Sequence, residues 1–184
     1  MRPRIAPAWH TTAWFNSDAP LALDQLRGRV VLLHAFQMLC PGCVQRGIPQ
    51  AQRVAEAFAG APVVVVGMHT VFEHHEAMQV ASLKAFLHEY RVGFPVGVDA
   101  PDPAGGAIPQ TMQAYAMQGT PTTILIDAEG RLRRHIFGVH DDLRLGAEIQ
   151  ALLGEIGDLR TRDVVPAPRA IGCDDEGCAV PTRA

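Results

Sequence analysis

The sequence predicts an α/β protein in which helices cover both faces of a mixed central sheet. Two continuous apolar runs, residues 30–36 and 62–68, have the length and residue types of strands buried on both faces. A helical pattern separates these runs, so we expect a parallel pair with a right-handed crossover. Residues 122–137 have the pattern of a hairpin, which adds antiparallel strands to the same sheet.

The first half of the chain opens with a lead-in over residues 5–26, in which we expect one short strand. A turn at residues 27–29 then leads into the first core strand. After the first cysteine pair, Pro49 interrupts a helical pattern and predicts a kink or an irregular turn, and Gly60 ends the helix. The apolar residues of this pattern follow one another at steps of four and three: Val44, Ile48, Ala51, Ala55 and Phe58.

The second half contains a long connection before the hairpin and a final helix after it. We expect one domain over residues 1–160 and a tail over residues 161–184 that carries a second cysteine pair. The expected elements are a helix over 82–90, a strand over 94–98, a loop over 101–106, a short helix over 108–117, strands over 122–127 and 131–137, and a last helix capped by Asp141 or Asp142.

Composition and charge narrow the class of partner. The chain has 184 residues, 48% of them hydrophobic, and a formal net charge of −3, so a packed core is expected and a nucleic-acid partner is not. No apolar stretch approaches the roughly 20 residues of a membrane helix, and no secretory signal is visible at the N-terminus. We therefore expect a cytoplasmic protein without a membrane partner, acting on a small molecule or another protein.

The four cysteines form two close pairs, Cys40 with Cys43 and Cys173 with Cys178. Cys40 lies where a buried strand gives way to a helix, so free backbone N–H groups and the helix dipole would stabilise its thiolate. We expect Cys40 to have a pKa below the ordinary thiol value and to be the nucleophile. Cys43 lies one helical turn away, within reach of a disulfide, and would resolve the mixed disulfide. Pro41 suits the first turn of the helix.

A zinc site is the non-enzymatic alternative, because all four cysteines could ligate one ion in a zinc-stabilised binding module. A Cys-x-x-Cys pair that follows a strand and opens a helix is instead typical of redox chemistry. The segment Glu73-His74-His75-Glu76 lacks the His-Glu-x-x-His spacing and is expected to be a solvated loop. We therefore expect no metal and no other cofactor.

Four stretches carry a resemblance to a known family: Trp14-Phe15-Asn16 with residues 20–33, Cys40-Pro41-Gly42-Cys43, residues 63–69 and residues 115–127. With them the sequence resembles the thioredoxin superfamily, and within it the TlpA-like and redoxin (AhpC/TSA-like) group, over about residues 9–156. The resemblance implies a thioredoxin-like fold with an insertion between the second core strand and the strand after a cis proline. It also implies a thiol–disulfide oxidoreductase with antioxidant activity.

The resemblance also implies a set of site residues and partners. Pro121 would be the cis proline facing the cysteines, and Thr120 would offer its backbone N–H and C=O to an extended substrate strand. Leu39, Pro41 and Gly42 would contact the substrate. That substrate would be a disulfide-bearing protein or a small thiol or disulfide, and an electron-donating redox partner would complete the cycle.

Three departures from the family pattern stand near the cysteines. Leu39 occupies a position where the group often has Trp, and His34 occupies the position of a buried acid in thioredoxins. Pro49 follows Cys43 by six residues, where many relatives have five, which suggests a local bulge. His34 either accepts the proton of Cys43 during resolution or is a packed histidine, and the sequence leaves both open.

Two further hypotheses stay open at this level. In a peroxiredoxin-like peroxidase, Cys40 would attack peroxide, but the expected Pro and hydroxyl residue are replaced by Leu33 and Gln37. The tail pair, Cys173 and Cys178, is either idle or a relay that exchanges disulfides with the first pair, because a tethered dithiol has a high effective concentration.

Overall fold

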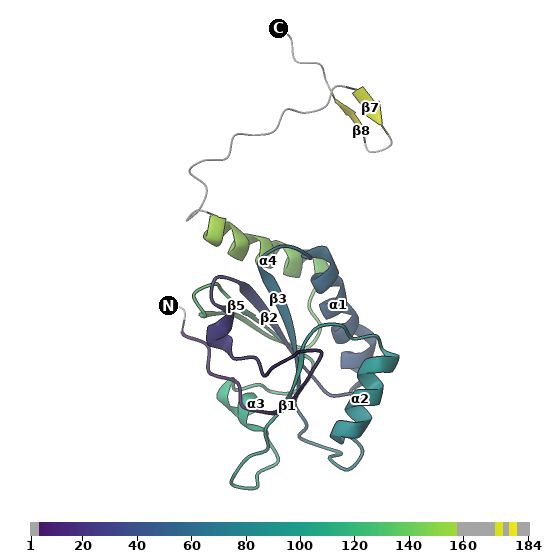
Figure 1. Cartoon of the computed structure of the whole chain (residues 1–184), viewed down its shortest axis with the longest axis vertical. Coiled ribbons are helices and arrows are strands. Elements are labelled where there is room, and N and C mark those ends of the chain that lie inside the picture. Colours follow the sequence, from purple (N-terminus) through teal and green to yellow (C-terminus); the bar gives the residue numbers. More distant parts are fainter. Residues whose placement is uncertain (1–3, 158–171, 175–176, 180–184) are drawn as a thin grey trace.

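The computed structural model describes residues 4–157, 172–174 and 177–179 (Figure 1). Six strands form one sheet in the order β1-β4-β3-β2-β5-β6, as the mixed α/β prediction requires. The strands are β1 (Thr11–Phe15), β2 (Val30–Phe36), β3 (Val63–His69), β4 (Val96–Asp99), β5 (Thr122–Ile126) and β6 (Leu132–Phe137). The helices are α1 (Ile48–Ala57), α2 (Val80–Glu89), α3 (Gln110–Ala114) and α4 (Asp142–Gly157), with a 3-10 turn, η1 (Leu23–Leu26), and a π-helical turn, η2 (Cys43–Gly47).

Strand β2 is the centre of the sheet, and all seven of its residues are buried. It runs parallel to β3, with Val30 opposite Val63, and antiparallel to β5, with His34 opposite Thr123. Strand β5 also pairs antiparallel with β6, so both the parallel pair and the hairpin are confirmed. The lead-in strand β1 pairs with β4 and forms the sheet edge remote from β6.

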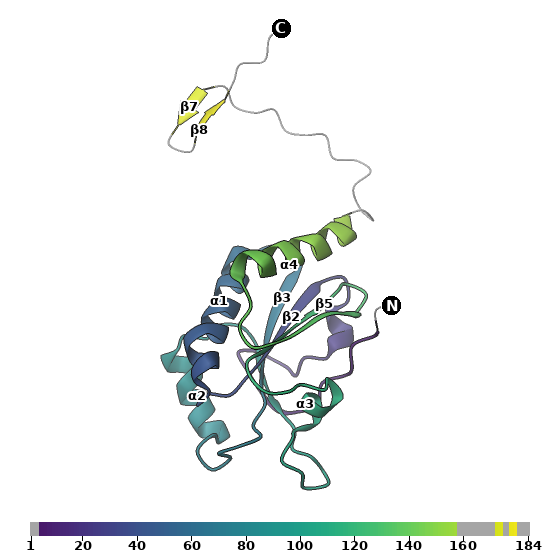
Figure 2. The same cartoon turned by 180° about the vertical axis from the view of Figure 1, so that it is seen from behind.

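Alternate residues of β2 enter two separate cores, as the period of a strand requires. Helices α1, α2 and α4 cover one face, where Leu32 and Phe36 pack against them. Helix α3 and η1 cover the other face, where Val31 and Leu33 pack. Both views show α3 on the side of the sheet away from α1 and α2 (Figures 1 and 2).

Several boundaries differ from the sequence-based ranges for local reasons. Helix α3 is shorter than the expected 108–117, because Pro109 is its N-cap and Ala116 has a φ of 52°. The N-cap of α4 is Asp141, whose Oδ1 accepts the N–H of Arg144 at 3.0 Å. The insertion between β3 and β5 consists of α2, β4 and α3.

The tail contains a described two-stranded antiparallel sheet, β7 (Gly172–Asp174) with β8 (Gly177–Ala179). Cys173 and Cys178 are register partners in this pair. Their side chains lie outside the described part of the structure. Within that part, none of the helices has the length and apolar character needed to cross a membrane.

Candidate redox site

The first cysteine pair lies where β2 passes into a helix. Strand β2 ends at Phe36, and a turn follows in which the N–H of Cys40 donates to the carbonyl of Gln37 at 3.2 Å. Residues 41–57 are then continuously helical, with a π-helical turn over Cys43–Gly47. The π-turn absorbs the extra residue before Pro49 and confirms the predicted bulge.

Cys40 directly precedes this helix, and its sulfur is in the position of a capping side chain. The N–H of Cys43 donates to Sγ of Cys40 at 3.3 Å, as the third helical N–H does to an N-cap oxygen. The Cys40 thiol in turn donates to the carbonyl of Thr120 at 3.5 Å. Cys40 is partly exposed, so its sulfur is both held by the fold and open to a substrate.

Cys43 has a different environment, because its side chain is fully buried. The pKa of the Cys43 thiol is raised to about 12, chiefly by burial and then by its hydrogen bond with Cys40, while hydrogen bonds with Gln37 and Thr120 act in the opposite direction. Both cysteines are free thiols. The pair therefore combines an accessible sulfur with a protected one.

The segment before β5 forms the opposite wall of the site. The Thr120–Pro121 peptide bond is cis, as the resemblance implied. Gly42 allows Pro121 to approach closely, since a Cβ atom at position 42 would lie 3.3 Å from Cδ of Pro121 and 4.0 Å from Sγ of Cys40. Pro41 is exposed beside this contact.

His34 lies beneath the π-turn on β2. Its side chain is 1% exposed, and its Nε2 is buried without a hydrogen-bond partner among the described residues. A Cβ atom on Gly47 would lie only 2.5 Å from Cε1 and 2.7 Å from Nε2 of His34. Burial lowers the pKa of His34 to about 4, so the imidazole is neutral near pH 7.

Exposed apolar side chains border the site. Leu39, which replaces the flat aromatic residue of many relatives, is 54% exposed next to Cys40. Phe137 and Val139 are about half exposed, and the N–H of Gly138 between them donates to the carbonyl of Pro121 at 2.8 Å. The sequence analysis missed Phe137 and Val139; the signal for them was an apolar strand end next to a glycine.

Sequence reasoning also missed Gly47 and Arg46, both in the π-turn. Gly47 is a glycine inside a helical pattern, which often marks a close contact. Arg46 is exposed, and a polar pocket lies between it and the connection from β6 to α4. Gln50 closes this pocket, with Nε2 donating to the carbonyl of His140 at 2.8 Å.

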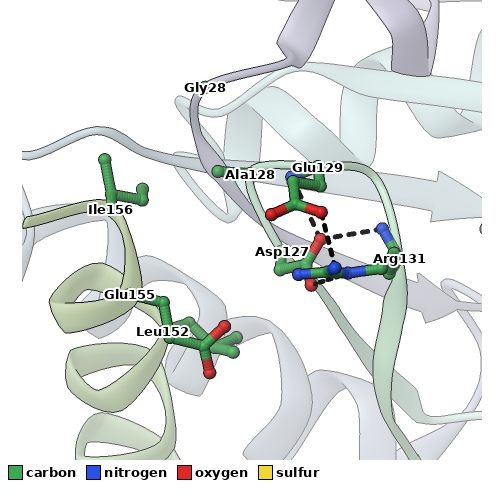
Figure 3. Close-up of a pocket in the computed structure, with 8 residues that line it drawn as sticks. All are labelled: Gly28, Asp127, Ala128, Glu129, Arg131, Leu152, Glu155 and Ile156. Carbon is green, nitrogen blue, oxygen red and sulfur yellow. Dashed lines mark hydrogen bonds and ion pairs between the residues drawn. The ribbon is translucent and has the colours of Figure 1, made fainter. Parts of the chain in front are cut away.

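A second pocket lies at the opposite end of the sheet, beside the turn from β5 to β6 (Figure 3). Asp127 is buried there and accepts hydrogen bonds from Nε of Arg131 at 2.8 Å and from Arg133 at 3.1 Å. Although burial opposes ionisation, these bonds and backbone N–H groups outweigh it and hold the pKa of Asp127 below its usual range. Arg133 also pairs with Glu155 of α4, so these charges join the hairpin to the helix.

In the described part of the chain, no group of three or more His, Cys, Asp or Glu side chains could hold a metal ion. The Glu73–Glu76 segment is exposed, as expected for a solvated loop. The four-cysteine zinc site needs the side chains of Cys173 and Cys178, which are not among the described parts of the structure.

The fold and the cysteine pair define a thioredoxin-like thiol–disulfide oxidoreductase. Residues 5–135 match the model of the AhpC/TSA family. The chain belongs to this family, which confirms the redoxin resemblance.

Solved structures similar to the chain agree with this class. The crystal structure of the thioredoxin-like superfamily protein SPOA0173 is 59% identical, with a TM-score of 0.80 over 82% of this chain and 97% of that one. A thiol-disulfide isomerase from Corynebacterium glutamicum is 43% identical, with a TM-score of 0.78 over 83% and 97% of the two chains. The protein DipZ of Mycobacterium bovis and that of Mycobacterium tuberculosis are each 31% identical over 134 residues. That match covers 71% of this chain but only 18% of the DipZ length.

Proposed function

We propose that this oxidoreductase exchanges disulfides with protein or small thiol partners through the motif Cys40-Pro41-Gly42-Cys43. The observation that carries the proposal is the unequal placement of the two sulfurs. Cys40 is partly exposed and accepts the N–H of Cys43, whereas Cys43 is fully buried. Cys40 is therefore the nucleophile and Cys43 the resolving thiol.

In the reducing direction, the Cys40 thiolate attacks one sulfur of a substrate disulfide. The new bond joins Cys40 to the substrate, and the other substrate sulfur leaves as a thiolate. Cys43 then loses its proton and attacks Cys40, which releases the reduced substrate and leaves a Cys40–Cys43 disulfide. An electron-donating dithiol partner reduces this disulfide and completes the cycle.

The substrate lies along the cis-proline segment in this proposal. The carbonyl of Thr120, which accepts the Cys40 thiol in the free protein, becomes available when Cys40 bonds to a substrate sulfur. It can then accept an N–H from an extended substrate strand. Leu39 gives such a strand an apolar contact, and Pro41 and Gly42 line the approach to the sulfur.

His34 is proposed as the group that receives the Cys43 proton during resolution. Its Nε2, which lies beneath the π-turn and has no hydrogen-bond partner in the described part of the chain, supports this role. Burial favours the neutral forms of both His34 and Cys43, so the proton stays on Cys43 in the reduced protein. The transfer is therefore proposed only for the mixed disulfide. His34→Asn, which keeps a polar side chain, should slow resolution and alter its pH profile; an unchanged profile would leave His34 as a packing residue.

The experiment that tests the function is a Cys43→Ser trap. Without the resolving sulfur, the mixed disulfide should stay on Cys40 and reveal the partner by mass. Cys40→Ser should trap nothing and fail to reduce a protein disulfide with dithiothreitol as the donor. Trapping on Cys43 in the Cys40→Ser protein would reverse the assignment.

Two assays separate the alternatives. A peroxidase would consume hydrogen peroxide faster than it reduces a protein disulfide. Gln37 argues against a peroxidase, because it offers no hydroxyl beside Cys40. Its side-chain amide instead donates to the carboxylate of Glu73 and accepts the N–H of Phe72. A zinc module would contain about one equivalent of zinc after purification.

A further inference from the structure

The tail carries a pair of cysteines that the site described above does not use. The register of β7 and β8 places Cys173 directly opposite Cys178. Opposed residues of an antiparallel pair have Cα atoms about 4.5–5.5 Å apart, which falls within the range that a disulfide spans. The backbone of this hairpin is therefore suited to a dithiol that can close.

The sequence of the hairpin is acidic. Asp174, Asp175 and Glu176 lie between the two cysteines. Their charges disfavour thiolates on either side, so an isolated hairpin is a slow nucleophile. A cation placed next to the turn would offset that repulsion.

Arg46 is such a cation, and it lies in the same π-turn as Cys43. Among the described residues Arg46 has no ion-pair partner, whereas the neighbouring Arg53 pairs with Asp142 at 2.8 Å. The acids of the same pocket are already engaged, since Asp142 also accepts from Gln50 and Asp141 caps α4. Among the described residues Arg46 is therefore the exposed cation of this pocket that no ion pair holds, although its charge also acts on Asp142.

The chain between the domain and the hairpin is long enough to bring them together. Residues 158–171 provide 14 residues, which can span about 45–50 Å when extended. Helix α4 has 16 residues, about 24 Å, and its first turn borders the pocket that contains Arg46. The length of this segment is therefore sufficient for the hairpin to reach the pocket.

We propose that the hairpin of β7 and β8 is a second redox pair of this chain, which docks its acidic turn beside Arg46 and exchanges disulfides with Cys40 and Cys43. The proposal rests on the proposed role of Cys40. It makes the tail the immediate electron donor of the active-site pair.

The exchange balances as two thiol–disulfide steps. A tail thiolate attacks Sγ of Cys40 in the oxidised pair, the Cys40–Cys43 bond breaks, and Cys43 leaves as a thiolate that takes up a proton. The second tail thiolate then attacks the tail sulfur of the mixed disulfide and releases Cys40. Two electrons pass to the active-site pair, the hairpin becomes a disulfide, and an external dithiol reduces it again.

The trap for this step is the variant Cys43→Ser/Cys178→Ser, which leaves only Cys40 and Cys173. After treatment with the thiol oxidant diamide, we expect a Cys40–Cys173 bond within one chain, identified by peptide mass mapping. Its rate of formation should not depend on protein concentration, because the effective concentration of a tethered tail is in the millimolar range. Cys43→Ser/Cys173→Ser tests the other tail sulfur. Bonds only between chains in both variants would overturn the proposal.

A charge reversal at Arg46 tests whether the acidic turn docks there. In the same trap, Arg46→Glu should slow formation of the bond by about fivefold at low salt. Arg29→Glu makes the same change at an exposed position before β2, at the opposite end of that strand, and should leave the rate unchanged. Equal rates in the two variants would reject the docking site.

The wild-type chain keeps this test separate from the proposed function. Its reduction of a protein disulfide with dithiothreitol depends on Cys40 and Cys43 and needs no tail relay. If this activity persists while neither trap forms a bond within the chain, only the relay fails. If this activity is absent as well, the proposed function fails with it.

Discussion

The imidazole of His34 occupies the space that a side chain at position 47 would need. A Cβ atom on Gly47 would lie 2.5 Å from Cε1 of His34, closer than van der Waals contact permits. The π-turn that contains Gly47 and the histidine at position 34 are therefore parts of one arrangement, because the imidazole leaves no room for a side chain at position 47.

Gly47→Ala should reveal this dependence. Alanine has the higher helix propensity by about 1 kcal/mol, yet overpacking against His34 should make the variant about 1–3 kcal/mol less stable. In a His34→Ala background the contact with the imidazole is gone, and only the contact with Cβ of Pro121 at 3.2 Å remains, so Gly47→Ala should cost less than in the wild-type background. Urea unfolding of the four proteins of this double-mutant cycle gives the measurement. Equal costs of Gly47→Ala in both backgrounds would mean that His34 is not the obstacle.

Stability should fall in mild acid because of two buried histidines. Burial lowers the pKa of His34 and of His69 from 6.5 to about 4, so below pH 6.5 the unfolded chain binds protons that the folded chain does not. The free energy of unfolding therefore falls as the pH drops from 6.5 to 4, by up to roughly 3 kcal/mol per histidine.

The free energy of unfolding measured in urea between pH 7 and pH 4 checks this dependence. His34→Leu should remove its share of the loss, while the same change at the exposed His75 should keep the wild-type profile. A steep loss that persists in full in His34→Leu would assign the acid sensitivity to other groups.

Leu39→Ser should weaken the binding of protein substrates. Because Leu39 is 54% exposed next to Cys40, its replacement removes an apolar contact without opening a cavity in the core. We expect KM for a protein disulfide to rise about threefold to tenfold, with little change in kcat or in the reduction of a small disulfide. Ile5→Ser is the matched control, since Ile5 is 56% exposed and lies at the other end of the sheet, where its backbone forms an isolated β-bridge with that of Arg131. A similar rise in KM for both variants would argue against contact with Leu39.

Asp127→Asn should destabilise the protein by about 1–3 kcal/mol, because it leaves Arg131 and Arg133 without a buried anion that both contact. Asp24→Asn removes an exposed ion pair with Arg27 and should cost less than about 0.5 kcal/mol. Thermal unfolding of both variants provides the comparison. Disulfide reduction should be unaffected in Asp127→Asn at a temperature where it is folded, because the network lies at the end of the sheet remote from Cys40.

The sequence predicted the core strands well because their signals are local. The apolar runs and the hairpin pattern correspond to β2, β3, β5 and β6, and the extra residue before Pro49 correctly indicated a bulge. The pairing of β1 with β4 could not be read in this way, because residues 11–15 are only partly buried and their partner lies in the insertion. The domain bounds, the cytoplasmic location and the roles of the site residues stay predictions.

Contacts between distant segments account for what the sequence analysis missed. Nothing in the pattern around Gly47 says that a histidine 13 residues earlier lies against it. Phe137 and Val139 become part of the site only because Gly138 bonds to the carbonyl of Pro121, a contact that the hairpin register fixes. The proposed binding role of Arg46 becomes visible only when the structure shows that the neighbouring Arg53 is paired with Asp142.

Strand β6 is an outer strand of the sheet, and its composition affects how the protein behaves at high concentration. The segment at its start is covered, since the N–H of Leu132 donates to the carbonyl of Arg4 at 2.8 Å. Beyond it come Arg133 and Arg134, whose guanidinium groups are held by Glu155 and Glu148 of α4. Charged side chains on an outer strand disfavour pairing with a strand from a second molecule, so this border resists the edge-to-edge association that leads to aggregation.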